Sequence, residues 1–206
     1  MERRFTNSQP VQIETRQNGS PVITGYASVF YRAGVPGTEF RLGKDVVERI
    51  EPTAFDSSMR RSDDVRALFN HDPSVVLGRS KSGTLRLSVD ATGLRYEIEP
   101  PDTQAAKDVM TSIKRGDITG SSFAFQTITD KFENSKPDNI RMVKDVTLWD
   151  VGPVTYPAYE ASTAGARALG LSDNFAERYE LWLKQERDKR YAIESRLKEI
   201  TVDMLR

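Results

Sequence analysis

Few residues in this chain could carry out covalent chemistry. His71 is the only histidine among 206 residues, and there is no cysteine. An imidazole acting as a general base near neutral pH must therefore be His71. A thiol nucleophile is excluded, so an activated nucleophile must be a hydroxyl, a lysine or a carboxylate. The segment Gly120-Ser121-Ser122-Phe123-Ala124-Phe125 offers two adjacent serines for this role.

The alternation of a β-strand distinguishes the two serines. Successive side chains of a strand point to opposite faces, so Ser121 shares a face with Phe123 and Phe125, and Ser122 shares the other with Ala124. If the phenylalanines point into the core, Ser121 is buried beside them. We therefore expect Ser122 to be the hydroxyl that is presented for chemistry.

A serine needs a base, and the base needs a group that fixes its tautomer. His71 would be the base, and Asp150 or the adjacent Asp72 would orient it. A lone histidine is more often structural, however, and a strand serine is usually no more than part of its strand. The residue types alone therefore leave a triad, a Ser-His dyad and a non-catalytic protein open.

The local pattern places these residues at strand ends. The strand expected over 65–70 runs into His71, and Pro73 favours an extended or turn conformation at Asp72. Residues 84–89 and 94–98 alternate around a turn, which predicts a hairpin. We expect further strands at 11–14, 22–30, 38–42, 46–50, 75–79, 119–129, 140–143 and 146–151, helices at 52–59 and 104–114, and a loop at 131–139. Residues 1–20 are polar and end in a turn signal.

Composition excludes several classes of function. Thirty basic residues balance thirty acidic ones, so no net charge favours nucleic acid or an anionic membrane surface. Without cysteine there is no disulfide and no Cys-based zinc site, and we expect neither metal nor cofactor. No apolar run reaches the ~18 residues of a membrane span. The first residues lack the apolar core of a secretory signal, so we expect a soluble, intracellular protein.

The composition also changes along the chain. We expect a main domain over residues 1–165, a linker over 166–173 that is rich in small residues, and a helical tail over 174–206. The tail has no glycine or proline, and its apolar residues recur at four- and three-residue spacing. It could dock on the domain, form a coiled coil or remain a solvated helix.

Several segments across residues 20–165 form a recognisable set: Gly25-Tyr26-Ala27-Ser28-Val29-Phe30, Leu68-Phe69-Asn70-His71-Asp72, Val76-Leu77-Gly78-Arg79, Gly93-Leu94, Pro100-Pro101-Asp102-Thr103, Ile113-Lys114-Arg115-Gly116-Asp117-Ile118-Thr119-Gly120-Ser121-Ser122-Phe123-Ala124-Phe125 and Asp150-Val151-Gly152-Pro153-Val154-Thr155-Tyr156-Pro157-Ala158-Tyr159. Together, and in this order, they resemble the caudovirus prohead serine protease family, the HK97-type maturation proteases.

The resemblance implies an α+β fold similar to herpesvirus assemblin, a mostly antiparallel β-barrel-like domain with a few surrounding helices. It implies a serine endopeptidase that acts inside the phage procapsid, in the host cytoplasm. Such enzymes cleave scaffold protein or the scaffolding segment of the major capsid protein, and also themselves. By position, His71 matches the family's histidine, Ser122 its serine and Asp150 its acid. The analogy and the tail also suggest a homodimer.

The chain departs from the family pattern at three positions. Asp150 stands where glutamate is common, Gly152 where serine is common and Ala124 where glycine is frequent. A Ser-His-His arrangement is impossible with one histidine, which leaves Asp150 first and Asp72 second as the acid, or a Ser-His dyad with no acid. Arg115, Arg141 or backbone N–H groups could form the oxyanion hole. The alternative function is a non-catalytic capsid-assembly or scaffold-binding module.

Overall fold

The computed structural model describes residues 1–155 and 175–204. The chain divides into two compact units, Met1–Leu171 and Ser172–Arg206. The linker expected over residues 166–173 lies outside the described residues. The domain boundary at residue 165 therefore stays a prediction.

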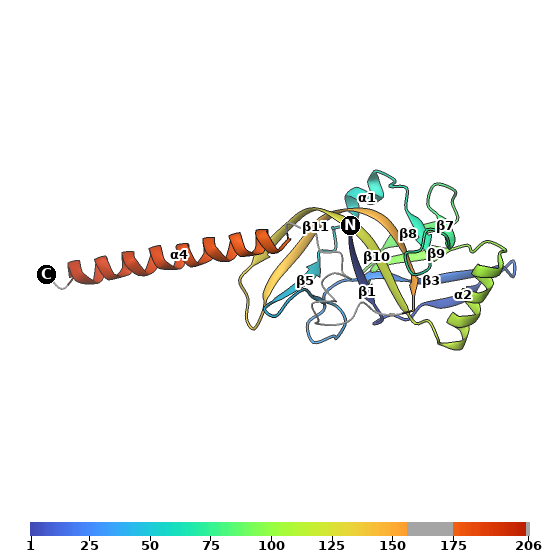
Figure 1. Cartoon of the computed structure of the whole chain (residues 1–206), viewed down its shortest axis with the longest axis horizontal. Helices are drawn as coiled ribbons and strands as arrows, with labels where there is room; N and C mark the ends of the chain where they lie inside the picture. Colours follow the sequence, from blue (N-terminus) through green and yellow to red (C-terminus); the bar gives the residue numbers. More distant parts are fainter. Residues whose placement is uncertain (156–174, 205–206) are drawn as a thin grey trace. The chain divides into compact units, whose positions relative to one another are not determined.

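The larger sheet of the first unit carries Ser122 and Asp150. Its strand order is β1-β10-β11-β5-β4, and β6 pairs with both β11 and β7. Figure 1 shows β10 and β11 running side by side through the unit, with β1 beside β10. The bounds are β1 (Glu2–Thr6), β4 (Phe40–Arg41), β5 (Val46–Ile50), β6 (Arg66–Leu68), β7 (Val76–Arg79), β10 (Gly120–Glu133) and β11 (Asn139–Val154).

The second sheet has the strand order β2-β3-β9-β8, and all its pairs are antiparallel. Its strands are β2 (Gln12–Thr15), β3 (Pro21–Val29), β8 (Leu85–Val89) and β9 (Gly93–Ile98). The hairpin expected over 84–89 and 94–98 is confirmed. Asp90 Oδ1 accepts hydrogen bonds from the backbone N–H groups of Thr92 and Gly93, which closes its turn.

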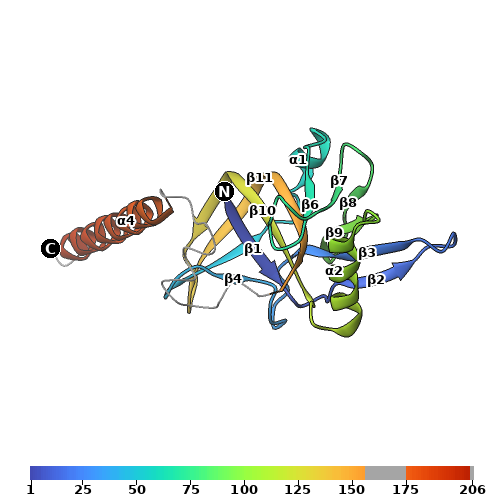
Figure 2. The ribbon, with the colours of Figure 1, turned by 45° about the vertical axis from the view of Figure 1, so that its right-hand side comes forward.

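Both sheets contribute to one hydrophobic core. Phe123 and Phe125 of β10 stack at 4.8 Å and are fully buried, as is Tyr96 of β9. The helix α2 (Gln104–Arg115) adds Val109 and Ile113 to this core and lies beside the second sheet (Figure 2). The short helix α1 (Asp56–Arg60) packs against β11.

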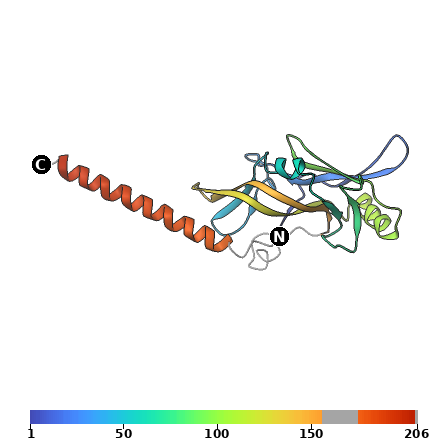
Figure 3. The same cartoon turned by 90° about the horizontal axis from the view of Figure 1, so that it is seen from above.

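The α+β class is confirmed, but the barrel-like arrangement is not, because neither described sheet closes on itself. The two strands expected at 140–143 and 146–151 are one continuous strand, β11 (Figure 3). β10 extends through Glu133 into the segment expected to be loop, and α1 begins at Asp56 rather than near residue 52. Residues 2–6, which the sequence marks only as polar, form β1.

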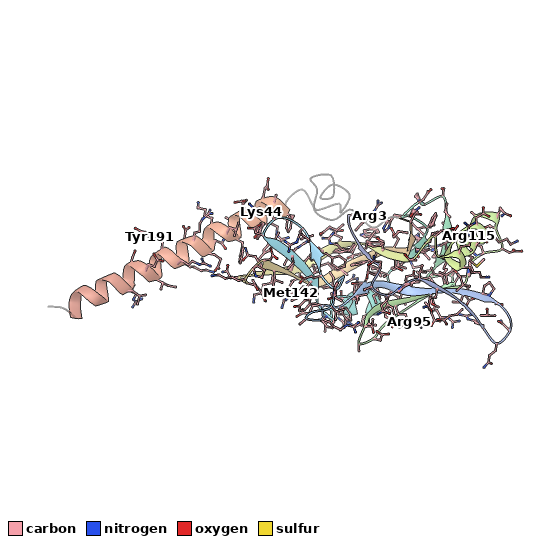
Figure 4. The ribbon with its side chains drawn as sticks, turned by 90° about the horizontal axis from the view of Figure 1, so that it is seen from below. Arg3, Lys44, Arg95, Arg115, Met142 and Tyr191 are labelled. Atoms are coloured by element: carbon pink, nitrogen blue, oxygen red, sulfur yellow. The ribbon has the colours of Figure 1, made fainter. Side chains whose placement is uncertain are left out.

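The second unit contains α4 (Phe175–Met204), which confirms the long C-terminal helix. Its first turns carry a stack of rings, Phe175 on Tyr179 and Tyr179 on Trp182, with centroids 6.1 and 5.8 Å apart. Tyr191, labelled in Figure 4, is exposed. Among the described residues, no helix combines the length and the apolar character of a membrane span.

Candidate active site

The pairing of β10 with β11 brings Ser122 and Asp150 to one face of the sheet. Ser122 lies opposite Gly152, and Ala124 lies opposite Asp150. Directly paired residues share a face, so the serine and the acid are diagonal neighbours. Ser121 points to the other face, where its hydroxyl lies 2.7 Å from the Tyr96 hydroxyl in the core.

His71 reaches this face from the end of β6. This short strand runs parallel to β11, and its Ala67 lies opposite Val151. The chain then turns, and the imidazole comes to lie between the two other side chains. His71 Nδ1 is 2.5 Å from Asp150 Oδ1, and His71 Nε2 is 2.7 Å from Ser122 Oγ. Three residues that are far apart in the sequence thus form one hydrogen-bonded chain.

The order of the groups sets the direction of the hydrogen bonds. An ionised Asp150 can only accept, so it favours the tautomer of His71 that carries its proton on Nδ1. Nε2 is then free to accept the proton of the Ser122 hydroxyl. All three side chains are almost fully buried, with 8% of the His71 and Asp150 side chains and 4% of Ser122 exposed. This arrangement suits transfer of a proton from a serine to an imidazole.

Ser122 has a second acceptor that the sequence did not indicate. Its Oγ lies 2.8 Å from the backbone carbonyl oxygen of Arg4, on the neighbouring strand β1. The hydroxyl has one proton, so it can donate to His71 or to Arg4, but not fully to both. The first strand of the chain therefore forms part of the site.

Asp72, the second candidate acid, is turned away from the imidazole. Its Oδ1 accepts hydrogen bonds from the backbone N–H and the hydroxyl of Ser74, at 2.8 and 2.6 Å. These bonds lower the pKa of Asp72. The structure therefore brings Asp150, and not Asp72, to His71.

The two arginines considered for the oxyanion hole have other partners. Arg115 is exposed on α2 (Figure 4) and pairs with Asp117. Arg141 is fully buried, and each of its guanidinium nitrogens donates within a cluster of polar side chains: Glu2, Glu48, Thr127 and Asp130. Burial lowers the pKa of Arg141, but the charges of the acids outweigh it and raise the pKa overall. Arg141 is thus an internal structural cation.

Two more features near the site escaped sequence reasoning. A Cβ on Gly152 would overlap the carbonyl oxygen of Leu68, so β6 approaches β11 more closely than any other residue at 152 would allow. The only sign of this close approach in the sequence is the glycine at position 152, where serine is common in the family. The Asn70 side chain bonds to Thr155, the residue after the end of β11, whereas its only signal in the sequence is its position next to His71.

The described residues contain no cluster of three or more His, Cys, Asp or Glu side chains that could hold a metal ion. The three candidate residues need no such ion to form their hydrogen-bonded chain. Together, His71 and Asp150 can activate the Ser122 hydroxyl as a nucleophile, and His71 can then give the proton to a leaving group.

Comparison with known proteins identifies the family of the chain. The sequence profile of the caudovirus prohead serine protease family matches residues 9–174. No curated protein matches the chain. Among solved structures, the capsid assembly protease of bacteriophage T4 is similar at 12% identity and a TM-score of 0.41, over 75% of this chain and 99% of that one. Because the family profile spans most of its length, the chain belongs to the caudovirus prohead serine protease family.

Proposed function

We propose that this protein is a serine endopeptidase of capsid maturation. It cleaves scaffold protein, or the scaffolding segment of the major capsid protein, inside the procapsid, and it also cleaves itself. The observation that carries this proposal is the chain of hydrogen bonds from Asp150 through His71 to Ser122 in a member of this family. Capsid or scaffold proteins are then its partners, and a second copy of the chain is a further one.

The geometry suggests the following mechanism. Ser122 Oγ attacks the carbonyl carbon of the scissile peptide while its proton moves to His71 Nε2. Asp150 stabilises the imidazolium that forms. The tetrahedral intermediate collapses, the C–N bond breaks, and His71 gives the proton to the leaving amine. A water molecule then attacks the acyl-serine, with His71 again as base, and Ser122 is regenerated.

The test is co-expression of the chain with the capsid protein and its scaffold, followed by mass spectrometry of the products. We expect a defined truncation of the capsid protein or scaffold with the wild type. Ser122→Ala and His71→Ala should each reduce it by roughly 10⁴-fold or more. Ser121→Ala is the matched control, because Ser121 bonds to Tyr96 in the core and not to His71.

Two outcomes would contradict the proposal. Normal processing by Ser122→Ala would exclude this serine as the nucleophile. Full-length capsid and scaffold proteins in every sample, with the assembled procapsid present, would favour a non-catalytic assembly module.

A further inference from the structure

His71 lies in a tight turn and has a backbone conformation that residues with a β-carbon adopt only rarely. Asn70 and His71 both have positive φ, 53° and 58°. The backbone N–H of Asp72 donates to the carbonyl of Phe69 at 2.9 Å, which closes a four-residue turn as in type I′. Such turns favour Asn at the first central position and Gly at the second. Asn70 fits the turn, whereas His71 occupies the position where glycine is preferred.

A turn with a strained central residue needs contacts that hold it in place. Asn70 provides three of them, one to Pro153 of β11 and two to Thr155, the residue that follows the end of β11. Its backbone N–H donates to the carbonyl of Pro153 at 3.1 Å. Its side-chain Oδ1 accepts from the Thr155 backbone N–H at 2.8 Å, and its Nδ2 donates to Thr155 Oγ1 at 3.2 Å.

These bonds join two parts of the site. The residue before His71 is tied to the strand that carries Asp150, a few residues beyond the acid. An error of about 1 Å in the position of a catalytic group can cost roughly 100-fold in rate. Because these bonds connect the turn that holds His71 to the strand that holds Asp150, they help to fix the distance between the two side chains.

We propose that Asn70 is a positioning residue, whose amide side chain clamps the His71 turn to the end of β11 and thereby aligns the imidazole between Asp150 and Ser122. This inference rests on the proposed function of the same site. Asn70 touches none of the reacting atoms, so it acts through His71.

The test compares three variants in the full-length protein. Asn70→Gly keeps a residue that accepts positive φ but removes both side-chain bonds. Asn70→Asp keeps the oxygen that accepts the Thr155 N–H. Asn18→Gly is the matched control, since Asn18 Oδ1 likewise accepts a backbone N–H two residues on, from Ser20 in an exposed turn.

Two readouts separate positioning from folding. The first is the rate at which a fluorophosphonate labels Ser122, with Ser122→Ala as the blank. The second is NMR of the imidazole, which is unambiguous because the chain has one histidine. We expect Asn70→Gly to label roughly 10- to 100-fold more slowly and to lose the hydrogen-bonded Nδ1–H signal. Asn70→Asp should retain most of both, and Asn18→Gly should match the wild type.

Labelling of Asn70→Gly at the wild-type rate would overturn the inference. If the wild type itself is not labelled, the proposed function fails, and the NMR signal alone decides the role of Asn70. Loss of the Nδ1–H signal in Asn70→Gly then supports the clamp, and its persistence refutes it.

Discussion

At the scale of single residues, backbone strain coincides with the proposed chemistry. A β-carbon at a φ of 58° is disfavoured, and residues held in such conformations tend to lie at functional sites. The sequence identified His71 because it is the sole imidazole, and Ser122 because of strand alternation. It could not reveal the turn conformation, which depends on bonds to Pro153 and Thr155 far along the chain.

The strain at residue 71 predicts that a glycine variant is more stable than an alanine variant, which is the reverse of the usual order. His71→Gly should be more stable than His71→Ala by about 1 kcal/mol, because alanine keeps the β-carbon that disfavours positive φ. Both variants lose the same imidazole bonds, so the difference isolates the backbone. Urea unfolding measures it.

Ser74, in the same loop, has no positive φ and serves as the control. There the usual order should hold, with Ser74→Ala more stable than Ser74→Gly by about 0.4–1 kcal/mol. Equal stabilities of His71→Gly and His71→Ala would contradict the strain.

At the scale of elements, an irregularity in β11 explains why periodicity alone misplaces its residues. Ala124 pairs with Asp150, but Phe125 pairs with Leu148, so Trp149 is the extra residue of a bulge. Leu148 therefore faces the core and Asp150 faces His71, although a regular strand would put both on one face. The choice between Asp150 and Asp72 consequently needed the structure.

The close approach of β6 and β11 predicts a large effect of one methyl group. In Gly152→Ala the new Cβ would overlap the rigid backbone carbonyl of Leu68 and push apart the strands that carry His71 and Asp150. We expect a loss of about 3 kcal/mol in the free energy of unfolding, and a slower reaction of Ser122 with a fluorophosphonate.

Gly83→Ala separates this clash from the cost of the backbone conformation. Gly83 has a φ of 76°, and a Cβ there meets nothing within 4 Å. It should lose about 1 kcal/mol and react normally. A Gly152→Ala variant no less stable than Gly83→Ala would show that β6 can move away freely.

At the scale of the whole molecule, ion pairs between distant strands explain why residues 2–6 form a strand that the sequence does not predict. Residues 2–6 belong to a polar stretch of the sequence, and the family match begins after them, at residue 9. Yet Glu2 and Arg4 are buried, because Arg4 pairs with Glu48 of β5 and Glu2 with Arg141 of β11. A buried charge is tolerable when it is paired, and these partners come from distant strands. Local patterns contain no sign of them.

This cluster makes the stability of the first unit depend on pH. Burial alone would raise the pKa of Glu2, but the hydrogen bond from Arg141 and the charges of Arg4 and Arg141 outweigh it and lower the pKa from 4.5 to about 2. A carboxyl group with a lowered pKa contributes stability above its unfolded pKa. That contribution is lost as the pH falls from about 4.5 toward about 2.

We therefore expect Glu2→Gln to be less stable than the wild type by roughly 3 kcal/mol at pH 7, and the gap to close toward pH 2. Urea unfolding at pH 7, 4 and 2.5 measures it. Glu39→Gln is the control, because Glu39 and Arg49 form a more exposed ion pair, which should contribute less than about 1 kcal/mol. A Glu2→Gln deficit that stays constant between pH 7 and 2.5 would mean that lost packing, rather than the ionised carboxylate, ties β1 to the strands around Ser122.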